Sequence, residues 1–266
     1  NKGRYNFDTF RVEYFADYNS AFEGFKAGTY TFRNEASSKI WATGYDFPAL
    51  EKKWVKKTTL PDGNLSSGQS FVLNLRREKF QDIRVRKAIG LMFNFEWSNS
   101  TLFYGLYERI NSFWDNSDLK AEGMPENEEL EILNKHKAVL DVNTFSEKVY
   151  TFPTSSSKQL DRKNLRQAST LLDQAGWKVG DDGLRRNSEG KTLDVEILND
   201  SQAFDRIINP YIENLKKLGI NAANIKIDNA QMTDRRRKFD FDILVGFLST
   251  QLTLSLIHIS EPTRPY

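Results

Sequence analysis

The sequence predicts an α/β fold, in which helices and strands alternate along the chain. Apolar residues recur at helical spacing in several stretches, for example at Leu165, Ala168, Leu171 and Leu172. Short runs rich in β-branched and aromatic residues lie between these stretches, as expected for strands. Gly176 directly follows the example helix, at a position where glycine commonly ends helices. Such alternation is typical of a sheet covered by helices.

The N-terminal part of the chain predicts a strand, a helix and a second strand. Apolar and charged residues alternate in the first strand, whose apolar members are Phe10, Val12 and Tyr14. Asp17 or Asn19 can cap the helix that follows, and Gly28 suits its C-terminal turn. The apolar face of this helix is formed by Ala21, Phe22 and Phe25. The elements expected next are a strand at 29–32, a short helix with a loop at 34–48, and a strand at 54–60.

The middle of the chain predicts a turn, a strand and amphipathic helices. Pro61 and Gly63 mark the turn at residues 61–64, because proline presets φ and glycine accepts a positive φ. A strand is expected at 70–75, and Asp82 begins a helix. The apolar face of that helix is formed by Val85, Ala88, Ile89 and Met92. The elements expected after it are a helix at 94–105, an acidic surface helix at 126–136 and a loop at 154–158.

The C-terminal part returns to strong periodicity. A helix begins at Asp161 and ends at Gly176, and a hairpin turns at residues 187–190. A long helix at 201–218 has a continuous apolar stripe. The remaining elements are a strand at 225–227, a basic helix that ends at Lys238, and a strand at 241–246.

Composition narrows the class of protein. With 39% hydrophobic and 28% charged residues, the chain is typical of globular domains. The net charge of +2 gives no reason to expect a nucleic-acid partner. The chain has no cysteine, which excludes disulfides, thiolate metal sites and cysteine nucleophiles. No apolar run approaches the roughly 20 residues of a membrane-spanning helix. No cofactor and no metal are expected.

Catalytic and phosphate-binding motifs are poorly supported, so we do not expect an enzyme. Of the two histidines, His136 lies in the acidic surface helix, without a nucleophile motif nearby. The residues 190–192 resemble the end of a phosphate-binding loop, but Arg185 stands where that loop needs glycine, and a strand follows. The basic run 235–238 could contact phosphates, but we interpret it as a solvated helix end, where the helix dipole favours cations. A pair of carboxylates for acid–base chemistry cannot be selected from the 36 acidic residues by sequence alone, so this class of site stays open.

A resemblance to a known family begins in residues 70–94. The segment "QSFVLNLRREKFQDIRVRKAIGLMFNFEW" at 69–97, which contains these residues, resembles family 5 of the bacterial extracellular solute-binding proteins, which bind oligopeptides, dipeptides and nickel. In that family a hinge strand with Asn precedes a "D-x-x-VR-x-A" helix. The matching residues here are Asn74, Asp82, Val85, Arg86 and Ala88.

Further motifs of the family follow in the same order. They are "AFEGFKAGTYTF" at 21–32, "TLLDQAGW" at 170–177, "NLKKLGI" at 214–220 and "DFDILVG" at 240–246. Three other segments are similar to the subgroup that binds microcin C and related peptides. They are "SKIWATGYDFPA" at 38–49, "LPDG" at 60–63 and "FEWSNSTLFYGLYERINSFWDNSDL" at 95–119.

The resemblance implies a periplasmic binding protein type II-like fold, with two lobes joined by hinge strands. It implies that residues 1–70 are the remainder of lobe one, and that residues 71–253 are a truncated lobe two. Residues 254–266 are expected to be a non-native tail. Their beginning, "LSLIHISEPTR" from residue 254, is similar to the translation of a sequencing-library adapter.

The resemblance also implies where a ligand would bind. The family holds its ligand in the cleft between the lobes, and the segments that meet the cleft supply the candidate contacts. These are Arg33, Asn34, Glu35, Trp41, Phe71, Asn74, Asn199, Asp200, Ser201, Phe247 and Ser249.

Two positions depart from the pattern of many oligopeptide binders of the family. Those proteins anchor the peptide's amino group with a Trp and, three residues later, an Asp. Phe247 and Thr250 occupy these positions here. A peptide with a blocked, formylated or otherwise modified N-terminus is therefore expected as ligand.

The implied partners are an oligopeptide or modified peptide and the permease and ATPase of an ABC importer. The implied location is the periplasm, with a signal peptide in sequence that precedes this chain, and a monomer is expected. Two alternatives stay open: a non-transport binding module, such as a chaperone or a signalling-receptor subunit, and an enzyme built on the same scaffold.

Overall fold

The chain divides into two compact units, Asn1–Pro61 (unit 1) and Asp62–Tyr266 (unit 2). The computed structural model describes residue 3, residues 6–66 and residues 68–248. Within these residues no helix is long and apolar enough to span a membrane. The expected non-native tail, residues 254–266, lies outside the described residues.

Unit 1 is built from three short helices around aromatic side chains. The helices are α1 (Tyr18–Lys26), α2 (Ser38–Thr43) and α3 (Pro48–Glu51). The predicted cap Asp17 accepts hydrogen bonds from the backbone N–H groups of Asn19 and Ser20, at 2.8 and 2.9 Å. Gly28 has a φ of +76°, as expected for the turn after the helix. The buried core residues are Phe22, Phe25 and Phe47.

The three strands predicted in unit 1 are wrong. Residues 10–14, 29–32 and 54–60 have no regular secondary structure. Phe10 and Tyr14 are 84% and 91% exposed, so the alternating residues have no buried side. A strand needs a hydrogen-bonded neighbour, and none pairs with these segments within the described residues. The alternation therefore reflects only a local preference for extended backbone.

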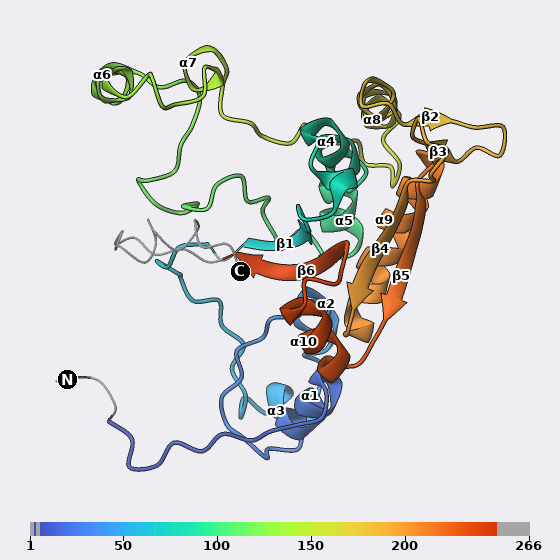
Figure 1. Cartoon of the computed structure of the whole chain (residues 1–266). Helices are drawn as coiled ribbons and strands as arrows, with labels where there is room; N and C mark the ends of the chain where they lie inside the picture. Colours follow the sequence, from blue (N-terminus) through green and yellow to red (C-terminus); the bar gives the residue numbers. More distant parts are fainter. Residues whose placement is uncertain (1–2, 4–5, 67, 249–266) are drawn as a thin grey trace. The chain divides into compact units, whose positions relative to one another are not determined.

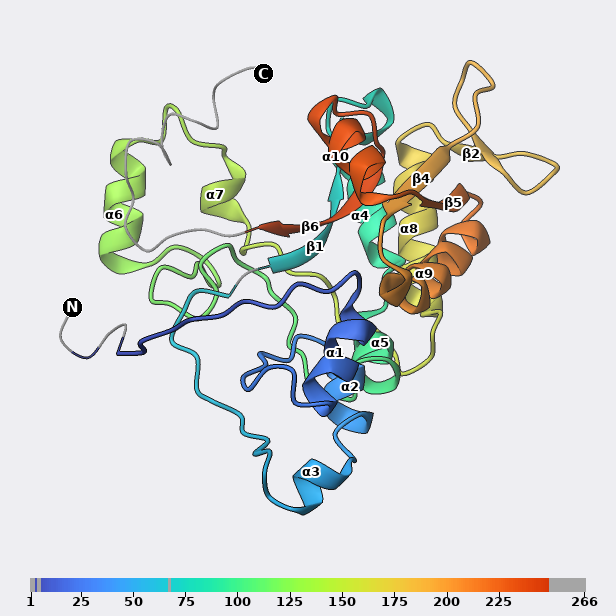
Figure 2. The same ribbon diagram turned by 90° about the horizontal axis from the view of Figure 1, so that it is seen from below.

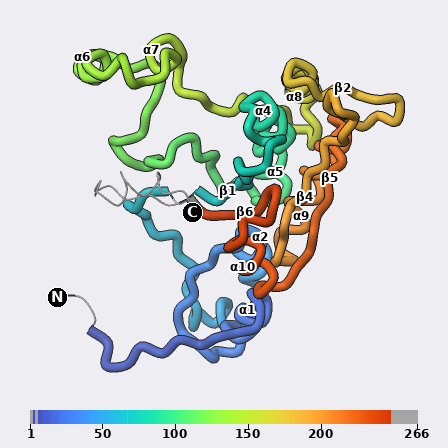
Figure 3. Tube along the Cα trace, in the orientation of Figure 1, coloured from blue at the N-terminus to red at the C-terminus, as the bar shows by residue number. Residues whose placement is uncertain are grey.

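Unit 2 contains a four-stranded mixed sheet in the order β1-β6-β4-β5. The strands are β1 (Gly68–Leu73), β4 (Asp194–Asn199), β5 (Asn221–Lys226) and β6 (Ile243–Leu248). β4 is parallel to both β5 and β6, whereas β1 is antiparallel to β6. β1 and β6 come from opposite ends of the unit and lie side by side (Figures 1 and 3). A separate two-stranded hairpin pairs β2 (Lys178–Val179) with β3 (Arg185–Arg186).

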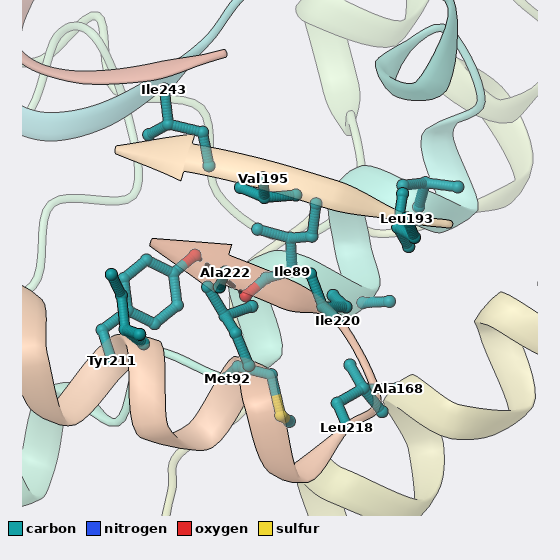
Figure 4. Close-up of a cluster of buried hydrophobic side chains, with 14 of the residues drawn as sticks. Ile89, Met92, Ala168, Leu193, Val195, Tyr211, Leu218, Ile220, Ala222 and Ile243 are labelled. Carbon is teal, nitrogen blue, oxygen red and sulfur yellow. Dashed lines mark hydrogen bonds between the residues drawn. The ribbon is translucent and has the colours of Figure 1, made fainter. Parts of the chain in front are cut away.

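Three amphipathic helices cover one face of this sheet. They are α4 (Ile83–Leu91), α8 (Arg162–Gln174) and α9 (Asp205–Lys217). The side chains of Asp82 and Asp161 cap the first two, as predicted. Figure 4 shows apolar side chains of the helices and of β4, β5 and β6 meeting in the core, where the Tyr211 hydroxyl donates to the Ile89 carbonyl at 3.0 Å. Burial of these side chains is the main stabilising term for the unit.

The opposite face of the sheet is covered by α10 (Asn229–Arg237), which Figure 1 shows on the other side of β6 from α4, and Figure 2 gives the view from below. Asp228 caps this helix by accepting a hydrogen bond from the Gln231 N–H at 2.8 Å. A smaller core lies beneath it; its buried members are Leu198, Phe241 and Leu244, and Met232 and Phe239 pack against them. This second core fixes α10 beside the carboxyl end of β4.

Two helices in the middle of the chain lie where they were predicted: α5 (Phe95–Thr101), which ends four residues before the expected 105, and α6 (Asn127–Lys135). A further short helix, α7 (Asn143–Ser146), was not predicted. The long helix expected at 201–218 is split into a 3-10 turn, η2 (Gln202–Phe204), and α9. Another 3-10 turn, η1 (Glu78–Phe80), precedes α4. β5 begins four residues before the expected strand 225–227, because its pairing with β4 extends to Asn221.

Candidate functional site

A hollow of about 600 Å³ lies beside the carboxyl end of β4 in unit 2. Asp200, a predicted contact, lines it together with Asn229, Met232, Thr233, Arg236, Arg237 and Phe239. Ligands of α/β proteins prefer the carboxyl ends of parallel strands, because loops and helix starts meet there. The hollow therefore occupies the part of unit 2 where the topology favours binding.

Asn199 and Ser201, which flank Asp200, form part of the support of this site. Asn199 is 3% exposed; its Nδ2 donates to Asp205 Oδ1 at 2.9 Å, and its Oδ1 accepts from the Ser201 N–H at 3.0 Å. Burial by itself raises the pKa of the Asp205 carboxyl, but hydrogen bonds and the ion pair with Lys226 outweigh it and lower that pKa. Asp205 thus stays an anion that fixes the turn after β4 through Asn199. Among residues 199–201, only Asp200 is exposed.

The basic run 235–238 is only partly the solvated helix end that its sequence indicates. Arg235 donates to Asp240 and lies 3.5 Å from a Glu196 carboxylate oxygen, and Lys238 pairs with Asp234 at 2.8 Å. Arg236 and Arg237 instead line the hollow. The sequence contains one signal for this arrangement, because positions 229, 233 and 236 fall on one face of a helix.

Two predicted contacts on β1 and in the turn after it have structural roles. The Phe71 ring packs against Phe93 and Tyr211, with ring centroids 5.3 and 4.9 Å apart. Asn74 is 4% exposed, and its Nδ2 donates to the carbonyls of Phe239 and Phe241 at 2.8 and 2.9 Å. Both amide protons of Asn74 are therefore used inside unit 2, and a ligand would find no free donor on it.

Replacing Asn74 by alanine should lower the free energy of unfolding of unit 2 by about 1–3 kcal/mol, because two carbonyls lose their donors. The change is measured as a shift in the urea midpoint followed by circular dichroism. An unchanged midpoint combined with weaker ligand binding would contradict the structural role and support a direct contact.

The last predicted contacts of unit 2 lie on and after β6. Phe247 is 66% exposed and stands opposite Gln69 of β1. Its ring is therefore available to a ligand. Ser249 lies outside the described residues.

In unit 1, Arg33 and Glu35 form a buried ion pair at 2.9 Å, with side chains only 6% and 2% exposed. The Glu35 carboxylate also accepts hydrogen bonds from the hydroxyls of Tyr18 and Tyr45 and from the Ser37 N–H. Burial alone raises the pKa of Glu35, but Arg33, the Tyr18 hydroxyl and the Ser37 N–H outweigh it and lower that pKa. The carboxylate is thus occupied by internal donors.

The other candidate groups of unit 1 differ in their exposure and partners. Arg33 Nη2 is buried and has no hydrogen-bond partner within the described part of the chain. Asn34 is exposed, and Trp41 is half-buried. The Lys57 ammonium lies 4.3 Å from the centre of a Trp41 ring, so this ring already interacts with a cation of the protein. No cluster of metal-ligating side chains occurs among the residues that the structure describes.

The structure matches a known class of fold. The oligopeptide-binding protein AppA from Bacillus subtilis, solved with a nonapeptide, matches with a TM-score of 0.54 at 20% identity. The match covers 90% of this chain and 40% of AppA. The fold is therefore that of the type II periplasmic binding proteins.

Sequence comparison gives the family. Residues 1–253 match the bacterial extracellular solute-binding proteins, family 5 (middle region), so the chain belongs to this family. A probable peptide-binding protein YejA from Agrobacterium fabrum is 43% identical over 252 residues, which are 94% of this chain and 41% of that protein. YejA from Escherichia coli is 37% identical over 244 residues, 92% of this chain and 40% of that protein. The chain thus spans about two fifths of the length of these relatives.

Proposed function

We propose that this chain is part of the substrate-binding component of an ABC importer that captures oligopeptides or modified peptides. The observation that supports it most is the family match along residues 1–253. The name of the A. fabrum relative, a probable peptide-binding protein, supports a peptide as ligand. Microcin C-like peptides are the modified ligands that we propose on the resemblance of residues 38–49 and 95–119.

The outer edge of β1 supports a peptide as ligand. β1 is an edge strand within the described sheet, and the Asn74 N–H donates to the Asp242 carbonyl across the β1–β6 register. In an antiparallel pair the backbone groups of successive residues point alternately toward and away from the partner. The backbone groups of Gln69 and Phe71 therefore point away from β6, where an extended peptide can add its own hydrogen bonds.

The complete protein would work as a clamp. We assign residues 1–70 to lobe one and residues 71–253 to lobe two, with the ligand held between them. Ligand binding and lobe closure would stabilise each other, and the permease with its ATPase would recognise the closed form. We propose a monomer in the periplasm that binds its ligand without chemical conversion.

Native mass spectrometry of the full-length protein that contains these residues tests the proposal. The expected result is a set of co-purified peptides that are recovered unchanged after incubation with the protein. A protein that retains no peptide, either from the cell or from an added peptide digest, would contradict the proposal.

The occupants of positions 247 and 250 predict selectivity for the peptide N-terminus. Because Phe247 and Thr250 offer no carboxylate, a free ammonium group would lose its hydration without a charged partner. We expect an N-formylated peptide to bind about tenfold more tightly than the same peptide with a free amino group. Calorimetry on the full-length protein measures this ratio. Tighter binding of the free form would refute the prediction, and Thr250→Asp should shift the preference toward the free form.

A further inference from the structure

The cations around Phe239 differ in how they are neutralised. Arg77 is paired with Asp240, and Arg235 is paired with Asp240 and Glu196. The guanidinium groups of Arg236 and Arg237 have no hydrogen bond or ion pair with any residue that the structure describes. Both are exposed and both line the hollow beside β4. Two positive charges thus face one concave surface without an internal partner.

Phe239 adds a second observation at the same place. It has a φ of +54°, a left-handed conformation that a residue with a Cβ adopts at a cost and that glycine usually takes at helix ends. Its ring lines the hollow, packs on the small core beneath α10, and lies 3.7 Å from the Arg76 guanidinium. An aromatic residue in a strained conformation points to a need for its side chain at this site.

The charges of the hollow select the ligand group. Arg236 and Arg237 contribute two positive charges and Asp200 contributes one negative charge. The Arg76 guanidinium, which lies against the Phe239 ring, adds a further positive charge nearby. The excess of positive charge suits an anionic group. A carboxylate matches the planar donors of guanidinium groups, and Phe239 offers an apolar surface beside them.

We infer that Arg236, Arg237 and Phe239 form a subsite for a carboxylate of the peptide ligand, with an apolar side chain of the ligand next to it. The inference rests on the proposed peptide-binding function. It adds that the protein prefers peptides that carry an anionic group. The carboxylate can be the C-terminal one or that of an Asp or Glu side chain.

The test compares peptides with free and blocked carboxylates. A chymotryptic digest of casein supplies peptides with an apolar residue next to the C-terminal carboxylate, and half of it is methyl-esterified. The mixed digest is incubated with the full-length protein, and retained peptides are quantified by mass spectrometry after gel filtration. The proteins compared are the wild type, Arg236→Gln/Arg237→Gln, and the control Lys238→Gln. Lys238→Gln removes a positive charge from an exposed ion pair of the same basic run, at a residue that does not line the hollow.

The wild type should retain free peptides about tenfold over their esters. In the double variant the ratio of free to esterified peptides should fall close to one. Retention of the esters by this variant shows that it is folded. Lys238→Gln should keep the wild-type ratio. Synthetic C-terminal amides of the best-retained peptides then distinguish the C-terminal carboxylate from side-chain carboxylates. A wild-type ratio near one, or an unchanged ratio in the double variant, would overturn the inference and leave the proposed function standing. If the wild type retains neither pool, the proposed function itself fails.

Discussion

Replacing Arg185 by methionine should lower the free energy of unfolding of unit 2 by about 3–5 kcal/mol, because several hydrogen-bond acceptors lose their donor together. The side chain is 1% exposed. Its guanidinium donates to the carbonyls of Leu218 and Trp177, to Asp173 Oδ1 and to Ser169 Oγ, at 2.6 to 2.9 Å. Ser169 and Asp173 belong to α8, Trp177 follows that helix, and Leu218 is the C-cap of α9, so one side chain connects two helices to β3. Methionine fills a similar volume but leaves these acceptors without a donor.

The neighbouring residue provides a matched control. Arg186 pairs with Asp182 at 2.7 Å on the surface, where solvent screens the interaction, so Arg186→Met should change stability little. Urea denaturation followed by circular dichroism measures both variants. Arg185→Lys should recover only part of the loss, because one ammonium group cannot reproduce the fork of donors. An equal loss of stability in Arg185→Met and Arg186→Met would contradict the prediction, because it would show that burial and the number of partners do not determine the effect.

The helices of unit 2 could be predicted because their signals are local. Asp82 and Asp161 cap helices within a few residues of themselves, and the apolar stripes behind them repeat within each helix. The strands expected in unit 1 are absent from the described residues, because a strand forms only beside a hydrogen-bonded neighbour, which a local sequence pattern does not show. Phe10 and Tyr14 carry the pattern of a strand, but the described part of the chain supplies no strand beside them.

The same distinction applies to the candidate site. The position of Asp200 follows from a strand end, which the sequence indicates. The role of Asn74 depends on carbonyls 165 and 167 positions further along the chain, which no local pattern indicates. Arg235 and Arg236 are adjacent and identical, yet Glu196 lies close to the first while the second lines the hollow. Long-range pairing therefore decides which polar residues are available to a ligand.

Replacing Glu35 by glutamine should destabilise unit 1 by about 3–5 kcal/mol at neutral pH, because the buried Arg33 guanidinium loses its counter-charge. Hydrogen–deuterium exchange of the peptide that covers α1 reports on this unit separately. We expect protection of α1 to fall strongly in Glu35→Gln. Glu23→Gln, which removes a carboxylate that is 69% exposed, should leave it unchanged. The double variant Arg33→Met/Glu35→Leu should recover part of the loss, because it leaves no unpaired buried charge.

The lowered pKa of Glu35 also determines how the stability of unit 1 depends on pH. The folded-state pKa lies below the ordinary value of 4.5, so unit 1 binds fewer protons at Glu35 than the unfolded chain does. The contribution of Glu35 is therefore fully present above about pH 4.5 and is lost as the pH falls through the lower folded-state pKa. Wild-type α1 should lose protection in this acidic window, and Glu35→Gln, which cannot titrate there, should show a flatter profile. If both proteins lose protection in parallel, other carboxylates govern the acid stability of unit 1.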